Sequence, residues 1–334
     1  MKRYLLYTDT KFKDPYISKT AHCLLRFQAQ NIVGILDYED DIGVNDQEIN
    51  KLMDKYAIKH YTSAEAIMND YSASEIDIVI GFAPIGGRLN QQQRDAIRLF
   101  CENEYCVING LHDFIDDQHV KNLRYNDYPR IIAEDIDYGK RIILTVGTDH
   151  SIGKMTATVK LCEYLKQNRA DVRWLATGQT GLILNDGIGH VIDAIPIDFV
   201  PGVIQNDLMS INSKTVIVEG QGSIFYPAYS PTSFALFHTC KPQQIILCHD
   251  AARKEGHFGN VLPSLSDAKQ CYDSLASYLG FETKIIGISV NTSMLSNEDY
   301  LNYKAEIEDS LQTPCYDFLR EVPIEIMKVI SSFD

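Results

Sequence analysis

The chain has 334 residues, which is enough for two domains that each bury a core of their own. Its formal net charge of −14 argues against nucleic acid or an anionic membrane as the main partner, because both favour a basic surface. No apolar run is long enough for a signal peptide or a membrane span, and the eight cysteines match no zinc template. We therefore expect a cytoplasmic protein with free thiols, no metal centre and small-molecule substrates.

The first 136 residues alternate strand-like and helix-like segments. Strands are predicted at 4–7, 32–36, 76–80 and 105–108, and helices at 19–28 and 89–102. Ser18 is expected to cap the first helix, and Thr62 to Glu65 has the pattern of a capping box. This alternation predicts a Rossmann-like domain with a parallel sheet over residues 1–136. No G-x-G-x-x-G follows the first strand, so the shape does not by itself imply a nicotinamide cofactor.

Residues 137–334 are predicted to form a second α/β domain. Its strands are expected at 141–146, 172–176, 215–218, 244–248 and 285–290, and polar or glycine-containing sequence follows most of them. In open α/β sheets, ligands bind at the carboxyl ends of the strands. We therefore expect these connections to converge on one crevice.

The sequence TVGTDHSIGKMTA at 145–157 joins the first of these strands to a helix predicted over 154–167. A strand, a glycine-rich turn ending in Gly-Lys and a helix are typical of a phosphate-binding loop, in which backbone N–H groups and the helix N-terminus face an anion. The match to G-x-x-x-x-G-K-[ST] is imperfect: five residues separate Gly147 from Gly153, and Met155 stands at the usual magnesium-binding position, one place before Thr156. Lys154 is expected to be partly exposed. We predict that a di- or triphosphate group contacts Gly147, Thr148, Asp149, Ser151, Gly153, Lys154, Met155 and Thr156.

Three acid–base candidates follow predicted strands. Glu219 ends the strand at 215–218, where a carboxylate serves magnesium or acts as a general base. His249 and Asp250 follow the strand at 244–248, and a histidine titrates near neutrality. A structural ion pair for Glu219 and a structural role for His249 stay open as alternatives.

The substrate contacts are predicted among arginines, amides and hydroxyls. Arg253 and Arg88 suit a bidentate grip on a carboxylate, although Arg88 could equally make a structural ion pair. The strand-end sequences TGQTG and EGQGS add four hydrogen-bonding side chains, and for TGQTG a simple tight turn is the equal alternative; the four are Gln179, Thr180, Gln221 and Ser223.

Several motifs together resemble a two-domain bacterial family, long labelled a domain of unknown function, that includes D-glutamate N-acetyltransferase. They are, in chain order, GFAPIGGRL, GLHDFI, VGTDHSIGKMTA, ATGQTGLIL, IDFVPG, VEGQGSIFYPAYS and LCHDAAR, and they span almost the whole chain. The resemblance implies transfer of an acetyl group from acetyl-CoA to the amine of D-glutamate or a similar acidic amino acid. The phosphate loop would then hold the phosphates of CoA, and the chain is expected to be a homo-oligomer.

The phosphate loop alone is also similar to that of dethiobiotin synthetase. That similarity implies an alternative function, a ligase or small-molecule kinase that uses ATP and magnesium, with Lys154 and Thr156 at the phosphates and Glu219 at the metal. A nucleotide sensor without catalysis is a third alternative. The substrate's chirality and the identity of the general base stay open at this point.

Overall fold

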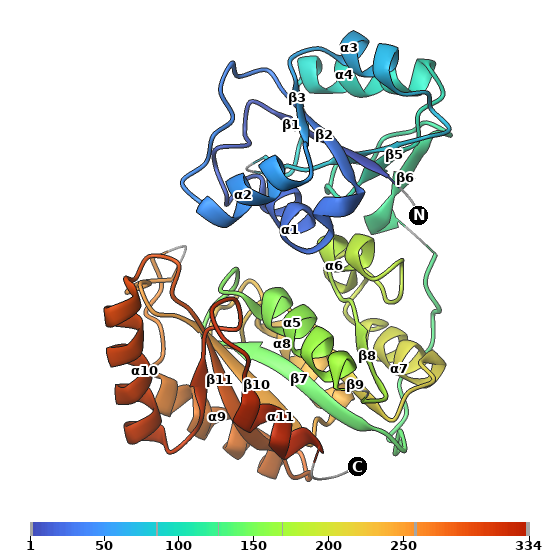
Figure 1. Cartoon of the computed structure of the whole chain (residues 1–334). Helices are drawn as coiled ribbons and strands as arrows, with labels where there is room; N and C mark the ends of the chain where they lie inside the picture. The colour runs from blue at the N-terminus through green and yellow to red at the C-terminus, as the bar shows by residue number, and fades with distance from the viewer. Residues whose placement is uncertain (1–2, 85, 126, 169, 257–258, 332–334) are drawn as a thin grey trace. The chain divides into compact units, whose positions relative to one another are not determined.

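The computed structural model describes the chain except for residues 1–2, 85, 126, 169, 257–258 and 332–334. The described residues form two compact units, 1–127 and 128–334. Each unit has a six-stranded parallel sheet with helices packed on its faces (Figure 1). The predicted fold of two parallel-sheet α/β domains is therefore confirmed.

The first unit has the strand order β3-β2-β1-β4-β5-β6. Its strands are β1 (Tyr4–Asp9), β2 (Ile32–Asp37), β3 (Lys59–Tyr61), β4 (Asp77–Ile80), β5 (Val107–Asn109) and β6 (Val120–Asn122). Its α-helices are α1 (Lys19–Gln28), α2 (Gln47–Lys55), α3 (Ala64–Asp70) and α4 (Gln91–Glu102). The sequence does not predict β3 or β6, because each has three residues and only Tyr61 among them is buried.

Of the two helix caps predicted in this unit, one lies at the predicted residue but makes no capping hydrogen bond, and the other is wrong. Ser18 does precede α1, but its hydroxyl donates to a backbone carbonyl of the preceding loop and does not cap the helix. The N-cap of α3 is Ser63, one residue after Thr62, and its side chain accepts a backbone N–H of the first turn. The capping box is found instead at α4, where the side chains of Asn90 and Gln93 each accept the other's backbone N–H.

The second unit has the strand order β12-β11-β10-β7-β9-β8, so β7 lies between β10 and β9. Its strands are β7 (Arg141–Gly147), β8 (Val172–Leu175), β9 (Thr215–Val218), β10 (Gln244–Asp250), β11 (Lys284–Asn291) and β12 (Cys315–Tyr316). Its α-helices are α5 (Lys154–Gln167), α6 (Gln179–Leu184), α7 (Val200–Ser210), α8 (Ser230–Cys240), α9 (Leu265–Tyr278), α10 (Asn297–Leu311) and α11 (Ile324–Ser331).

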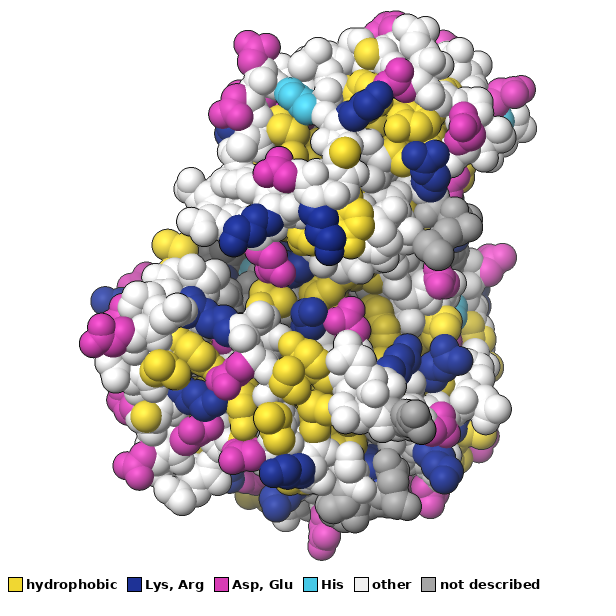
Figure 2. Space-filling view, in the orientation of Figure 1, with side chains coloured by type: hydrophobic (Ala, Val, Ile, Leu, Met, Phe, Trp, Pro, Cys, Tyr) yellow, Lys and Arg dark blue, Asp and Glu magenta, His cyan; other side chains and the backbone are white. Residues whose placement is uncertain are grey.

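Each unit has its own hydrophobic core, built on the central strands of its sheet. The strands β7, β9 and β10 are buried over most of their length, as expected where helices cover both faces of a parallel sheet. On the face of the molecule that Figure 2 shows, acidic and basic side chains are interspersed with hydrophobic ones. Among the described residues, no helix combines the length and hydropathy that spanning a membrane requires.

Candidate functional site

The connection from β7 to α5 is a tight loop, and each of its two glycines is needed for a different conformational reason. A Cβ on Gly147 would lie 2.6 Å from Cδ1 of Ile152, so a side chain at this position would require Ile152 to move. Gly153 has open space around it but a φ of 109°, which residues other than glycine rarely adopt. Ser151 also has a positive φ, 51°. The conformation of this loop is therefore explained by its own residues, without reference to a ligand.

Lys154 begins α5 and lies inside the loop. Its side chain is buried, with 6% of the residue exposed, so the predicted partial exposure is wrong. Its Nζ donates to the carbonyl of Asp149 at 2.7 Å, and its Cδ would lie 3.1 Å from a Cβ added to Gly220. The loop's own carbonyl thus solvates the ammonium group, which is why a lysine is stable at this depth.

A buried pair of hydroxyls joins α5 to the two central strands. The Oγ1 atoms of Thr145 in β7 and Thr158 in α5 are 3.0 Å apart, and the N–H of Gly220 donates to Thr145 at 2.9 Å. Both threonines are fully buried, so these bonds satisfy groups that water cannot reach. The sequence gives one signal for them, a threonine within an otherwise apolar strand.

Arg253, predicted to bind a substrate carboxylate, contacts the phosphate loop itself. Its Nη1 donates to Oδ2 of Asp149 and to the carbonyl of His150, both at 2.9 Å, and its Nη2 donates to the carbonyl of Ser151 at 3.3 Å. Burial raises the pKa of Asp149, but hydrogen bonds from the His150 N–H and from Arg253 outweigh it, and the pKa lies below its ordinary value. The buried aspartate of the loop is therefore paired with a partly exposed arginine from the turn after β10.

His249 lies at the end of β10, half-buried beside the loop. Its Nδ1 is 2.8 Å from the Oγ1 of Thr148. Burial lowers the pKa of His249 below its ordinary value of 6.5; the charge of Asp250 opposes this shift and the charge of Arg253 adds to it. The imidazole is consequently neutral at neutral pH, the state that a general base requires.

Asp250, the third predicted catalytic residue, closes the turn after β10. Its Oδ1 accepts the N–H of Ala252 and its Oδ2 accepts the side-chain amide of Asn291, both at 3.1 Å. The bond from Ala252 closes the turn, and the bond from Asn291 ties β10 to its neighbour β11. The carboxylate therefore has a visible structural task, and its catalytic role stays a prediction.

Glu219 follows β9, on the opposite side of β7 from His249. It is 4% exposed, and its Oε2 accepts the N–H of Thr177 at 3.0 Å. The Thr177 hydroxyl in turn donates to the Glu219 carbonyl at 2.7 Å, and a Cβ on Gly181 would approach Oε2 to 2.3 Å. The carboxylate thus holds the start of α6 close to β9, and these contacts favour a structural role over that of a general base.

Two side chains that were predicted to contact the substrate, Gln221 and Ser223, form hydrogen bonds within the protein. Nε2 of Gln221 donates to the hydroxyl of Thr177 at 3.1 Å. The Ser223 hydroxyl is buried and donates to the carbonyl of Gly147 at 3.1 Å. Ser223 therefore fixes the beginning of the phosphate loop from the β9 side.

The other predicted contacts lie at helix starts or in the first unit. Gln179 and Thr180 belong to the first turn of α6, so TGQTG is the entry to a helix rather than only a turn. Met155 is buried and Thr156 is half-buried in the first turn of α5. Arg88 is an exposed residue of the first unit. Their predicted roles stay predictions.

An aromatic cluster beside the loop is not evident from the sequence. The ring of His150 lies 5.0 Å from that of Tyr229 and 6.5 Å from that of Tyr226, and the two tyrosines are 5.5 Å apart. Both tyrosines follow the glycine-containing sequence after β9. The sequence signal for this cluster is two tyrosines three residues apart in the segment that follows EGQGS.

A glycine-shaped loop between a central strand and a helix that begins with a buried lysine defines the second unit as a P-loop-containing α/β domain. Residues 132–327 match the P-loop domain described as the domain of unknown function DUF1611_C, and residues 43–124 match the Rossmann-like domain DUF1611_N. The chain belongs to the DUF1611 family.

Two curated relatives carry an enzyme name. A protein of a Pseudoalteromonas species named D-glutamate N-acetyltransferase is 28% identical over 329 residues, covering 93% of this chain and 97% of the relative. A protein of Tritonibacter scottomollicae with the same name is 29% identical over 310 residues, covering 86% and 90%. A crystal structure of a DUF1611 family protein from Anabaena variabilis superposes with a TM-score of 0.86 at 25% identity, covering 99% of this chain and all of that one. The family resemblance and the two-domain fold are thereby confirmed.

Proposed function

We propose that this protein is an N-acetyltransferase that moves the acetyl group of acetyl-CoA to the amine of D-glutamate or a similar acidic amino acid. The two relatives of that name, which align with most of the chain, support the substrate class. In this reaction the amine attacks the thioester carbonyl and CoA leaves as its thiolate. The amine gives up a proton, and a base on the protein must accept it.

The observation that carries the proposal is the contact between the His249 imidazole and the phosphate loop. His249 is 2.8 Å from Thr148, the residue that directly follows the glycine of β7. If Nδ1–H donates to the Thr148 hydroxyl, Nε2 carries the free electron pair that accepts the amine's proton. The candidate base and the phosphate loop are therefore held together by this contact.

The loop suits a phosphate group that does not react. CoA carries a diphosphate and a ribose phosphate, which the Lys154 ammonium and the N-terminus of α5 would hold. No phosphoryl group moves in acetyl transfer, so the reaction does not need a magnesium-binding hydroxyl at the position of Met155. The buried methionine there is consistent with a loop used only for binding.

The direct test is product formation. The purified protein is incubated with acetyl-CoA and a panel of D- and L-amino acids, without ATP or magnesium. We expect thiol release that requires an acidic amino acid, and a product heavier by one acetyl group in mass spectrometry. Absent thiol release across the panel, together with magnesium-dependent ATP consumption, would replace the proposal by the ligase or kinase alternative.

A pair of substitutions decides between the two candidate bases. His249→Ala should lower kcat by about a hundred-fold, a typical contribution of a general base. Glu219→Gln keeps the volume of the side chain and should lower kcat less, because Glu219 binds backbone within the protein. The opposite ranking, with both variants folded by circular dichroism, would assign the base to Glu219.

A further inference from the structure

We propose that Arg253 and Asp149 are a positioning pair that orients the backbone of the phosphate loop and holds it against the turn that carries His249. The inference concerns the same site and rests on the proposed function for its kinetic readout. It gives Arg253 a role toward the loop in place of the predicted role toward a substrate carboxylate.

The contacts of Arg253 act on three consecutive residues. The guanidinium binds the side chain of Asp149 and the carbonyls of His150 and Ser151. In a trans peptide the carbonyl and the following N–H point in opposite directions. Arg253 therefore turns the N–H groups of Ser151 and Ile152 away from itself. Successive N–H groups fixed in this way are the donors that make an anion-binding concavity.

The same arginine connects the loop to the proposed base. Arg253 follows His249 by four residues, and its N–H donates to the Asp250 carbonyl at 3.2 Å within the turn after β10. On the loop, Asp149 is the neighbour of Thr148, which contacts His249. The loop and the turn thus share two contacts, Arg253 with Asp149 and His249 with Thr148. Loosening the ion pair should displace the phosphate contacts and the base together.

A substrate carboxylate would have to compete with Asp149 for the guanidinium. Asp149 is buried; Arg253 pairs with its Oδ2 at 2.9 Å, and the N–H and ring of His150 contact its Oδ1 at 2.8 and 3.0 Å. Drawing Arg253 away would leave a buried carboxylate without that charge, which is strongly unfavourable. The geometry therefore favours an arginine that stays on the loop through the reaction.

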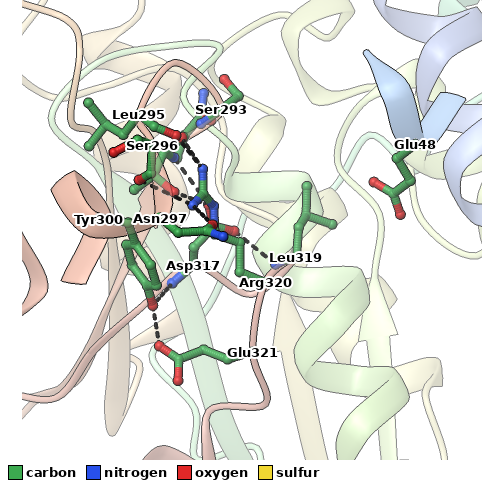
Figure 3. Close-up of polar contacts among 12 residues, drawn as sticks. Glu48, Ser293, Leu295, Ser296, Asn297, Tyr300, Asp317, Leu319, Arg320 and Glu321 are labelled. Atoms are coloured by element: carbon green, nitrogen blue, oxygen red, sulfur yellow. Dashed lines mark hydrogen bonds and ion pairs between the residues drawn. The ribbon is translucent and has the colours of Figure 1, made fainter.

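A second arginine in the same unit offers a matched control. Arg320 donates to the carbonyls of Thr292 at 2.8 Å and Leu295 at 2.7 Å, and to the side chain of Asn297 at 2.8 Å (Figure 3). Its Nε lies 3.7 Å from Oδ2 of the buried Asp317. This arginine also joins loop carbonyls to a buried aspartate, but at the ends of β11 and β12 and not on the phosphate loop.

The experiment measures CoA binding by calorimetry, which needs no turnover, and steady-state kinetics with each substrate varied. Arg253→Gln should weaken CoA binding by about ten-fold and raise the KM for acetyl-CoA more than that for the amino acid. Arg253→Lys should restore part of the loss, because a point charge can pair with Asp149 but cannot span the two carbonyls. Arg320→Gln should lower the Tm and leave CoA binding within about two-fold.

The proposal is overturned if Arg253→Gln leaves CoA affinity unchanged and raises only the KM for the amino acid, which is the signature of a substrate contact. It is also overturned if Arg320→Gln weakens CoA binding as much as Arg253→Gln does. Should no acetyl transfer occur while the Arg253 variants still lose CoA affinity, the proposed function fails and the positioning pair stands.

A double-mutant cycle supplies the second readout. Asp149→Asn and Arg253→Gln should be strongly non-additive in CoA affinity, because either substitution alone breaks the same pair. Additive losses would mean that the two residues act independently, and the pair would then be rejected. Thermal unfolding of each variant identifies any that no longer folds, and Arg253→Lys, which keeps the charge, carries the test in that case.

Discussion

The two units of this protein use the same position in their sheets in different ways. Each connects a central strand to a helix: β1 to α1 in the first unit, and β7 to α5 in the second. A Thr-Asp pair ends β1 and another opens the connection after β7, and both helices begin with a lysine, Lys19 and Lys154. Only the second connection has the geometry of a phosphate loop, so sheet topology alone does not create one.

The first connection is filled by its own side chains. Phe12 is 1% exposed, and its N–H donates to Oδ2 of Asp37 at 3.1 Å. The Thr8 hydroxyl donates to the same oxygen at 2.7 Å. Ser18 is buried ahead of α1, and Lys19 points to solvent. A phosphate group at this connection would lie next to a carboxylate and an aromatic ring, whereas the second connection offers backbone N–H donors and an ammonium group.

In the second connection, a glycine gives the backbone its turn and a lysine supplies a positive charge. Gly153 adopts a backbone angle that turns the chain into α5, and Lys154 is thereby drawn under the loop. The aspartate of this loop is neutralised by Arg253, whereas Asp37 in the first unit is satisfied by hydroxyl and N–H donors. The difference between the two sites is therefore local chemistry on a shared scaffold.

The largest expected difference between the two connections is in the stability of the first unit when Phe12 is replaced. Phe12→Ala removes a buried aromatic ring and should destabilise the first unit by about 3–5 kcal/mol. CoA affinity, measured by calorimetry below the unfolding transition, should not change. A parallel loss of CoA affinity would show that the first connection takes part in binding and would break the comparison.

Replacing each of the two lysines by alanine tests the role of the positive charge of Lys154. Lys154→Ala should weaken CoA binding by ten- to a hundred-fold, corresponding to about 1.5–3 kcal/mol for a charge-assisted contact. The matched control is Lys19→Ala, which removes the exposed lysine at the equivalent position of α1 and should leave the affinity unchanged. Equal affinities of wild type and Lys154→Ala would remove the phosphate-loop assignment.

A glycine substitution sharpens the contrast in backbone conformation. Gly153→Ala meets no atom within 4 Å, so its cost is backbone strain of about 1–3 kcal/mol. Gly280→Ala is the control, since Gly280 also has open space and a positive φ, 78°, but lies after α9. Both variants should lower the Tm, and Gly153→Ala alone should weaken CoA binding. Loss of CoA affinity in the control as well would mean that strain anywhere in the unit is sufficient.

The smallest expected effect is on the pH profile. His249 must be neutral to act as a base, so kcat/KM should fall as the pH drops through its pKa, with a midpoint below the ordinary 6.5. Arg253→Gln should move this midpoint upward, because the arginine's charge lowers the pKa of His249. The substrate's own amine gives a separate step at higher pH. The absence of any step below 6.5 in the wild type would argue against a buried His249 as the base.

Local sequence patterns predicted the phosphate loop, because its two glycines and its lysine lie within eight residues of one another. The same patterns could not predict the role of Arg253, since its partner Asp149 is 104 residues away and becomes its neighbour only when β10 pairs with β7. The burial of Lys154 could not be predicted for a related reason. Its carbonyl partner is close in sequence, but the turn of the loop decides whether the two can meet.

The claim at the centre of this account is that the second connection binds CoA through its phosphates without a metal ion. Calorimetric titration of CoA and of ATP, each with EDTA and with magnesium, tests it most directly. We predict that CoA binds with the same affinity in both conditions and that Lys154→Ala weakens this binding. Magnesium-dependent binding of ATP with no binding of CoA would contradict the account.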